Sequence, residues 1–147
     1  MDPTLTAADT HVSSVFFAVP FDAVWPRVTD PEAFPTLYPN RASAIERTGR
    51  GAFRATGPAG DEFTVYPHLD REFGIADVEV VDETGASEFS RSRLFPVGEG
   101  ACVLVHLAVR RPRLLDDEWA AHRRGTDDDL RRAKVVIEDE FGDGRKG

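Results

Sequence analysis

The segment between residues 41 and 111 restricts the fold most, because it consists of short strand-like stretches joined by turns. Six stretches rich in β-branched and aromatic residues occupy 42–48, 52–56, 62–69, 73–81, 87–95 and 101–110. The residues that join them include glycine, proline or acidic residues, as hairpin connections require. No helix-length pattern separates the stretches, so we expect consecutive strands to pair as an antiparallel meander.

The residues before this region predict a strand followed by two short helices. Residues 11–19 are β-branched and aromatic, and Pro20 ends the strand. Residues 21–29 place apolar side chains at helical spacing. Asp30-Pro31 then supplies an N-cap and a proline at the first helical position, which predicts a second short helix as far as Leu37.

The residues after Pro112 predict one long helix. Acidic residues at 116–118 place negative charge at its start, and apolar side chains then recur every three or four positions from Trp119 to Phe141. Gly125 lies inside this pattern, where a glycine costs about 1 kcal/mol relative to alanine. It therefore indicates a bend, a close backbone contact or a break in the helix.

The length of the chain, 147 residues, suits one domain. We expect this domain to cover residues 11–141, with flexible tails at 1–10 and 142–147. No apolar run is long enough to span a membrane, and the N-terminus lacks the pattern of a signal peptide. These features predict a cytoplasmic protein.

The charge and the cysteine count argue against several kinds of partner. The formal net charge is −8 and no lysine- or arginine-rich block is present, which argues against nucleic acid and anionic membrane surfaces as partners. Cys102 is the single cysteine, so the sequence predicts neither a disulfide framework nor a cysteine-based zinc site. Phosphate-binding and dinucleotide-binding glycine motifs are also absent, and we expect no metal and no cofactor.

Three stretches resemble parts of one known superfamily. Residues 18–32, with Trp25 and Asp30-Pro31, are similar to its first strand exit and two short helices. Residues 62–70 resemble its strand that ends in an aspartate turn, and residues 130–138 resemble the end of its long helix. With the order of elements over residues 11–141, they resemble the helix-grip fold of the SRPBCC superfamily. That superfamily contains START domains, pollen-allergen-like plant proteins and bacterial polyketide cyclase/dehydrase-like proteins.

The resemblance implies an α+β fold in which a curved, seven-stranded antiparallel sheet wraps around the long C-terminal helix. It implies a bacterial protein that binds a small hydrophobic or aromatic, polyketide-like metabolite in an internal cavity. The sequence leaves open whether the protein also catalyses an aldol-type cyclisation or a dehydration. The alternatives are a non-catalytic carrier, sensor or resistance protein, and a protein-interaction module similar to chaperone activators, which predicts a filled core.

The stretch from Glu62 offers the most informative polar residues. Side chains alternate along a strand, so Tyr66 and His68 share one face and Val65 lies on the other. If the polar face were exposed, the apolar face would pack on the helix. The resemblance implies the reverse, with Tyr66 and His68 in the pocket.

The last two strands leave the same question of direction. Both faces of residues 101–110 are mostly apolar; the resemblance implies that Val103 and its row line the cavity and that His106 points outward. Arg91 and Arg93 share a face, and an inward arginine needs an acceptor. The sequence does not decide whether these arginines bind a ligand or face solvent.

The candidate residues follow from these assignments. As catalytic candidates we take His68 as acid or base, Tyr66 as donor to a carbonyl and Arg91 as stabiliser of an enolate. The candidate ligand-binding residues are Trp25, Phe34, Tyr38, Thr64, Val78, Phe89, Val103, Val105, Leu107, Trp119, His122 and Thr126. Trp25, Phe34 and Tyr38 are expected to form the mouth of a cavity of about 300–1,000 Å³.

Overall fold

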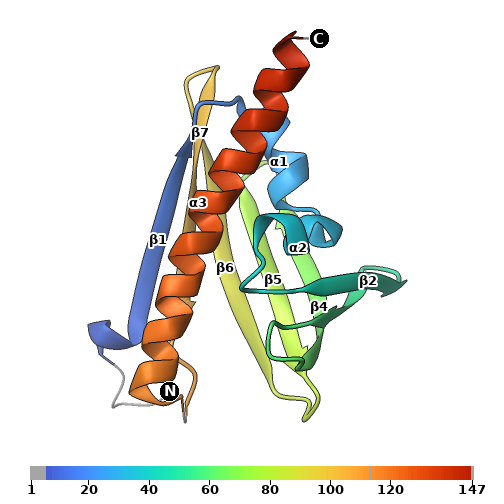
Figure 1. Cartoon of the computed structure of the whole chain (residues 1–147), viewed down its shortest axis with the longest axis vertical. Helices are drawn as coiled ribbons and strands as arrows, with labels where there is room; N and C mark the ends of the chain where they lie inside the picture. Colours follow the sequence, from blue (N-terminus) through green and yellow to red (C-terminus); the bar gives the residue numbers. More distant parts are fainter. Residues whose placement is uncertain (1–5, 113, 147) are drawn as a thin grey trace.

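The structure, a computed structural model, describes residues 6–112 and 114–146, with only the backbone for 143–146 (Figure 1). Its strands are β1 (Thr10–Phe17), β2 (Ala44–Gly49), β3 (Ala52–Thr56), β4 (Glu62–Asp70), β5 (Ile75–Asp82), β6 (Ser87–Val97) and β7 (Ala101–Val109). Its α-helices are α1 (Phe21–Val28), α2 (Phe34–Leu37) and α3 (Asp116–Lys146), with 3-10 turns η1 (Ala7–Asp9) and η2 (Pro31–Ala33). The ends of the strands lie within two residues of the predicted ones.

The seven strands form one antiparallel sheet in the order β1-β7-β6-β5-β4-β3-β2. Strands β2 to β7 follow one another as a meander, which confirms the prediction. The last strand, β7, also pairs with the first strand, β1. The long helix α3 crosses one face of this sheet, and α1 and α2 pack beside it (Figure 1). This is the helix-grip architecture that the sequence resemblance implied.

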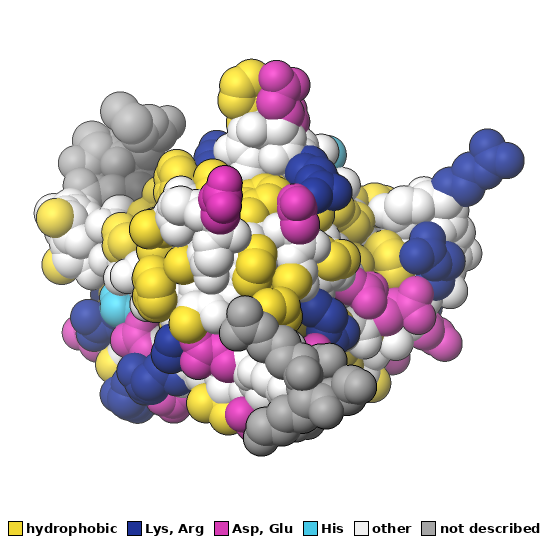
Figure 2. Space-filling model, turned by 90° about the horizontal axis from the view of Figure 1, so that it is seen from above, with side chains coloured by type: hydrophobic (Ala, Val, Ile, Leu, Met, Phe, Trp, Pro, Cys, Tyr) yellow, Lys and Arg dark blue, Asp and Glu magenta, His cyan; other side chains and the backbone are white. Residues whose placement is uncertain are grey.

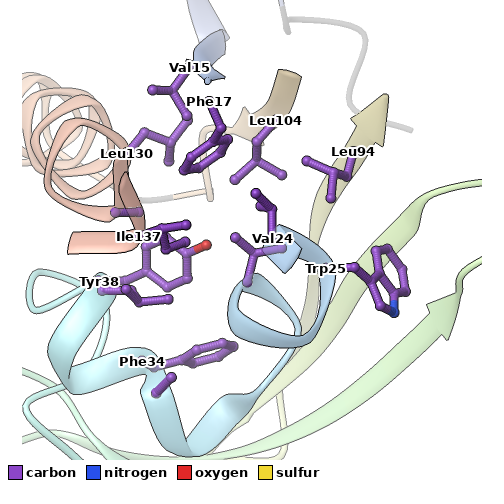
Figure 3. Packing of buried hydrophobic residues seen from close by; sticks show 14 of the residues in the cluster. Val15, Phe17, Val24, Trp25, Phe34, Tyr38, Leu94, Leu104, Leu130 and Ile137 are labelled. Atoms are coloured by element: carbon purple, nitrogen blue, oxygen red, sulfur yellow. The ribbon is translucent and has the colours of Figure 1, made fainter. Parts of the chain in front are cut away.

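The core lies between α3, the short helices and the inner face of the sheet. The predicted stripe of α3 is confirmed, since Trp119, Leu130, Ala133 and Ile137 are all buried. Leu130, Ala133 and Ile137 belong to one core cluster with side chains of the sheet, such as those of Phe17, Leu94 and Leu104 (Figure 3). Val65 of β4 belongs to the same cluster. In β7 the buried row is therefore the even-numbered one.

The helix α3 continues unbroken past Gly125, so of the three alternatives for this glycine the close contact is the one observed. A Cβ at Gly125 would lie 3.2 Å from the Cβ of Asn40. The missing side chain lets the loop after α2 approach the helix backbone, where Asn40 Nδ2 donates to the Gly125 carbonyl at 3.3 Å.

Regular elements occupy parts of both terminal segments that the structure describes. Thr6 and Asp9 cap the η1 turn with reciprocal hydrogen bonds, and β1 already begins at Thr10. At the other end, α3 continues through residue 142 to Lys146. Residues 1–5 and Gly147 of the predicted tails lie outside the described residues.

Candidate functional site

A small cavity lies between the inner face of the sheet, α2 and α3. Its residues come from α1, α2, the loop after α2, four strands and α3. They are Val28, Thr29, Phe34, Tyr38, Arg41, Leu69, Ala76, Val78, Ser92, Leu104, His106 and Leu130. The space open to water-sized molecules inside it is about 20 Å³, room for roughly one water. This volume lies well below the predicted 300–1,000 Å³.

His106 is the polar group that β7 contributes to this cavity. It is 4% exposed and pairs across the sheet with Ser13 of β1 and Ser92 of β6. Its Nδ1 lies 2.9 Å from Ser92 Oγ. Burial, with a contribution from the nearby charge of Arg41, lowers the pKa of His106 to about 3. The imidazole is therefore neutral at physiological pH.

Arg41 brings a positive charge to the same cavity from the loop after α2. Its guanidinium lies over the rings of Phe34 and Tyr38, 5.5 and 5.2 Å from their centroids, and donates to Ser90 Oγ at 3.1 Å. Burial lowers the pKa of Arg41. Among the described residues, no carboxylate lies within ion-pair distance of this guanidinium. An arginine placed in this way has unused capacity to bind an acceptor.

Tyr38 contributes a phenol. Its ring points from the end of α2 into the group of buried side chains (Figure 3). Burial raises the pKa of Tyr38 to about 12, so the hydroxyl keeps its proton. Within the described part of the chain the hydroxyl has no hydrogen-bond partner.

The loop that carries Arg41 is fixed to α3 by Asp129. This carboxylate is buried and accepts hydrogen bonds from the backbone N–H and the side-chain amide of Asn40, at 3.1 and 2.9 Å. Burial raises the pKa of Asp129 despite these bonds. Because Asn40 precedes Arg41, this anchor sets where the guanidinium enters the cavity.

Three predicted ligand-binding residues, Phe34, Tyr38 and Val78, line the cavity together. The predicted direction of β4 is wrong. Val65 is buried on the inner face, whereas Tyr66 is 38% exposed and His68 lies beside Glu79 and Phe89 on the outer face. The reason is hydrophobic: the apolar row of β4 packs on the core, and the polar row, which also contains Thr64, faces away from α3.

The predicted direction of β7 is also wrong, whereas the sequence had left the direction of β6 open. Val103, Val105 and Leu107 lie on the outer face, while His106, expected outside, is inside. Phe89 and the two arginines of β6 share this outer face. The inner row of β7 contains Cys102, Leu104 and Ala108 besides His106. The imidazole of His106 can be buried at little cost, because Ser92 gives it a hydrogen-bond partner.

Arg91 does not approach the cavity, because Asp77 holds it on the outer face. The buried carboxylate of Asp77 accepts from Arg91 at 3.0 Å, from Arg93 at 3.1 Å and from the Ser92 N–H at 3.0 Å. Burial alone would raise the pKa of Asp77. The hydrogen bonds from Arg91 and Ser92 and the two arginine charges outweigh it, so the pKa lies below its usual value.

Asp77→Asn should reveal this arrangement in the acid range. A lowered folded-state pKa stabilises the protein above the unfolded pKa of about 3.9, and this stabilisation is lost as the pH falls through the folded value. We expect Asp77→Asn to reduce the free energy of unfolding by about 1–2 kcal/mol at pH 7, since its partners are half exposed. Urea unfolding at pH 7 and pH 2.5 should show the difference from wild type shrinking at the lower pH. Glu62→Gln, which removes an exposed ion pair with Arg54, should change stability little at either pH.

The remaining predicted residues lie away from the cavity. Trp25 is buried and stacks on Phe21, with ring centroids 5.6 Å apart. Trp119, near the start of α3, donates from Nε1 to the Ala8 carbonyl at 3.0 Å. His122 is exposed and stacks on Trp119, and the hydroxyl of Thr126 donates to the His122 carbonyl.

Arg41, Ser92 and His106 were not predicted as cavity groups. Arg41 lies in a loop without periodicity, so no pattern indicated its direction. The usable signal was on the two strands: Ser92 and His106 are directly paired polar residues, and the other residues in the row of His106 are apolar.

A second hollow of about 530 Å³ lies at the surface between the start of α1, the β4–β5 turn and the end of β6. Phe21, Phe73 and Phe95 line it. Figure 2 looks onto this end of the molecule and shows hydrophobic side chains gathered among a few acidic ones. Asp22, Arg71 and Glu72 also line the hollow, and Arg71 is already paired with Asp22.

Neither a metal centre nor a membrane-spanning helix is found within residues 6–112 and 114–146. No three histidine, cysteine, aspartate or glutamate side chains in these ranges gather closely enough to hold a metal ion. None of the helices in this part of the chain is long and apolar enough to cross a membrane.

The comparisons with known proteins rest on structure. No family model and no curated protein matches the sequence. The Zhui aromatase/cyclase from Streptomyces sp. R1128 is similar with a TM-score of 0.68 and 18% identity, over 88% of this chain and 93% of that one. Norcoclaurine synthase from Thalictrum flavum, in complex with dopamine and hydroxybenzaldehyde, gives 0.60 and 18%, over 88% and 86%. DynU16, from the dynemicin biosynthetic locus, gives 0.63 and 23%, over 88% of this chain and 47% of its own. At these identities the likeness establishes the helix-grip fold.

Proposed function

We propose that this chain binds a small, largely apolar molecule that carries an oxygen acceptor, in the cavity between α3 and the sheet. The observation that carries the proposal is the guanidinium of Arg41, which lies among aromatic side chains. Among the described residues the Asp129 carboxylate acts on its charge, but no carboxylate forms an ion pair with it. Removing a positive charge from water is costly unless an acceptor replaces the lost hydration. A carbonyl, phenolate or carboxylate oxygen of a ligand would do so.

The other cavity groups suit the same ligand. The walls are mainly aliphatic and aromatic, as expected for a site that takes an apolar body. The Tyr38 hydroxyl can donate a second hydrogen bond. His106 can offer Nε2, which has no hydrogen-bond partner among the described residues. Dopamine and hydroxybenzaldehyde, the two molecules in the norcoclaurine synthase complex, are of this type: an aromatic ring with oxygen substituents.

The titration behaviour of the cavity favours binding over proton-transfer catalysis. A general base works best with a pKa near the working pH. The pKa of His106 is about 3, which makes it a weak base, and that of Tyr38 is about 12. The predicted catalytic groups His68, Tyr66 and Arg91 lie on the opposite face of the sheet. We therefore propose a carrier or sensor role.

Ligand entry requires the cavity to enlarge from about 20 Å³ towards the several hundred that a drug-sized molecule fills. The Arg41 side chain is the part suited to move, because its hydrogen bond to the Ser90 hydroxyl can be exchanged for one to a ligand. Asn40 keeps the backbone of the loop on α3 meanwhile.

The test is ligand binding to wild type, Arg41→Met and Arg41→Lys. Isothermal titration calorimetry should show micromolar binding of members of a panel of hydroxylated and carboxylated aromatic compounds. Arg41→Met keeps the apolar stem but removes the charge, so it should weaken binding by about 10- to 100-fold, as expected for one charge-assisted hydrogen bond. Arg41→Lys should retain part of the affinity.

Arg91→Met is the matched control, because it removes an arginine from the outer face. It should leave the affinity unchanged. If Arg41→Met binds as tightly as wild type while Arg91→Met weakens binding, the site lies on the other face and the proposal fails.

A protein-interaction role is the second candidate, and the small cavity favours it. A filled core is what an interaction module needs, and the interior here leaves room for about one water. Failure of the whole panel to bind, together with native mass spectrometry that shows only the mass of the chain, would favour this role.

A further inference from the structure

The outer face of β1, β7 and β6 is unusually apolar for a surface exposed to water. Six of its side chains are between 38% and 62% exposed: Val12, Phe16, Phe95, Val97, Leu107 and Val109. They are neighbours, because Val12 pairs with Leu107, and Phe16 and Phe95 both pair with Val103. We call this surface the outer apolar face.

The sequence of β7 gives an independent reason to expect that this face is covered. A strand with one solvated face alternates apolar and polar residues, whereas a strand covered on both faces is apolar throughout. From Ala101 to Val109 the one strongly polar residue is His106, and it points inward. The core covers the inner row of β7, but no element among the described residues covers the outer row.

We propose that the outer apolar face is the interface of a homodimer, in which two copies pack their sheets face to face. Three strands cover about 14 Å by 30 Å, roughly 400 Å², which is the size at which apolar patches on monomers become functional. This is about half of the roughly 800 Å² per partner of a standard stable interface, so we expect a dimer that dissociates on dilution.

The charges favour a second copy as the partner. The chain carries a net charge of −8, so two copies repel each other over most orientations. The outward rows of β1, β6 and β7 contain no aspartate or glutamate, and their charges are those of Arg91 and Arg93. Two copies can therefore approach through this face without opposing their acidic groups.

The arginines also select one direction for the two-fold axis. Arg93 and Ser14 lie on opposite sides of Val105, because β6 and β1 flank β7. An axis parallel to β7 places β6 of one copy over β1 of the other, so that arginines meet the uncharged row of β1. An axis across the strands would place the arginines of both copies against each other. The first arrangement is the one we infer, with Leu107 facing Leu107 of the second copy.

Extension of the sheet through the edge of β1 is a less suitable route to a dimer. Lys134 of α3 donates to the Phe16 carbonyl at 2.6 Å, and Glu138 accepts from the Ala18 N–H at 2.8 Å. These side chains occupy backbone groups that an added strand would need.

Sedimentation velocity from 1 to 100 µM tests the proposal on the full chain. Wild type should sediment as a dimer of the 16.2 kDa chain, and Val12→Glu and Leu107→Glu should each weaken association by at least 100-fold. Val135→Glu is the control, since Val135 is equally apolar and 59% exposed on α3. It should remain dimeric. Circular dichroism should show all three variants folded.

Cross-linking tests whether the outer apolar face lies in the interface. Leu107→Cys should form a covalent dimer with a short bifunctional thiol reagent, whereas Val135→Cys should not; Cys102 is buried in both variants. A monomeric wild type at 100 µM would overturn the proposal. So would a dimer that neither Val12→Glu nor Leu107→Glu dissociates. Neither outcome bears on ligand binding, which is measured separately.

Discussion

Gly74→Ala should lower the free energy of unfolding by at least about 3 kcal/mol. Gly74 has φ +67° in the turn between β4 and β5, a region that costs a residue with a side chain about 1–2 kcal/mol. A Cβ there would also lie 2.1 Å from the Leu94 carbonyl oxygen. The turn cannot retreat without loss, because the Leu94 N–H donates to the Gly74 carbonyl at 2.8 Å. Strain and clash therefore add.

Gly85→Ala separates the two contributions. Gly85 has φ +87° in the turn between β5 and β6, and a Cβ there would meet no atom within 4 Å. The free energy of unfolding of Gly85→Ala should therefore fall only by the cost of placing alanine at a positive φ, about 1–2 kcal/mol. Thermal unfolding should show the melting temperature of Gly74→Ala about 10 °C or more below wild type, and that of Gly85→Ala only a few degrees below. Equal losses in the two variants would contradict a steric role for Leu94.

The order of elements could be predicted from the sequence because each is marked locally. Glycine, proline and acidic residues separate the strands, and the three- and four-residue spacing after Trp119 identifies the long helix. These signals depend on neighbouring residues only. They do not depend on how the sheet curves, so they were sufficient for the fold.

The faces of the strands could not all be predicted, because that choice depends on what covers each face. For β4, the expectation that apolar residues point inward agrees with the structure. The resemblance to the superfamily gave the opposite direction, which is wrong. For β7 this expectation does not distinguish the two faces, since both rows are mostly apolar. If the outer row is covered in a dimer, as we infer, this ambiguity has a physical cause: both rows of β7 avoid water.

The cavity itself could be predicted only in part. Phe34 and Tyr38 were expected from the short helices, but Arg41 reaches the cavity because Asn40 is held by Asp129, 89 residues further along the chain. Such a contact has no signature in a single sequence. Gly125 is the one local feature of the sequence that indicated a close contact here. It could not show that the contact is with Asn40.

His106→Gln should remove a large part of the acid sensitivity of the protein. In the unfolded chain a histidine has a pKa of about 6.5, whereas burial lowers the pKa of folded His106 to about 3. Above pH 6.5 both states are neutral and the group has no effect. Below pH 6.5 the histidine of the unfolded state binds a proton, whereas His106 in the folded state stays neutral. The free energy of unfolding therefore decreases as the pH is lowered to about 3. Between pH 7 and pH 4 this amounts to about 3 kcal/mol.

Glutamine keeps a hydrogen-bonding group beside Ser92 but does not titrate, so the variant isolates the proton. Its stability at pH 7 should be lower than that of wild type, because the side chains differ in shape. Its further loss between pH 7 and pH 4, measured by urea unfolding, should be smaller than the loss in wild type by about 3 kcal/mol. His122→Gln is the comparison variant. Burial lowers the pKa of His122 as well, so this variant should also lose acid sensitivity, but less than His106→Gln, because the His122 side chain is exposed on α3 whereas His106 is 4% exposed. If the pH dependence of His106→Gln equalled that of wild type, His106 would be protonated in the folded protein as readily as in the unfolded chain. The interior around Arg41 and Ser92 would then be open to water, and the prediction would be wrong.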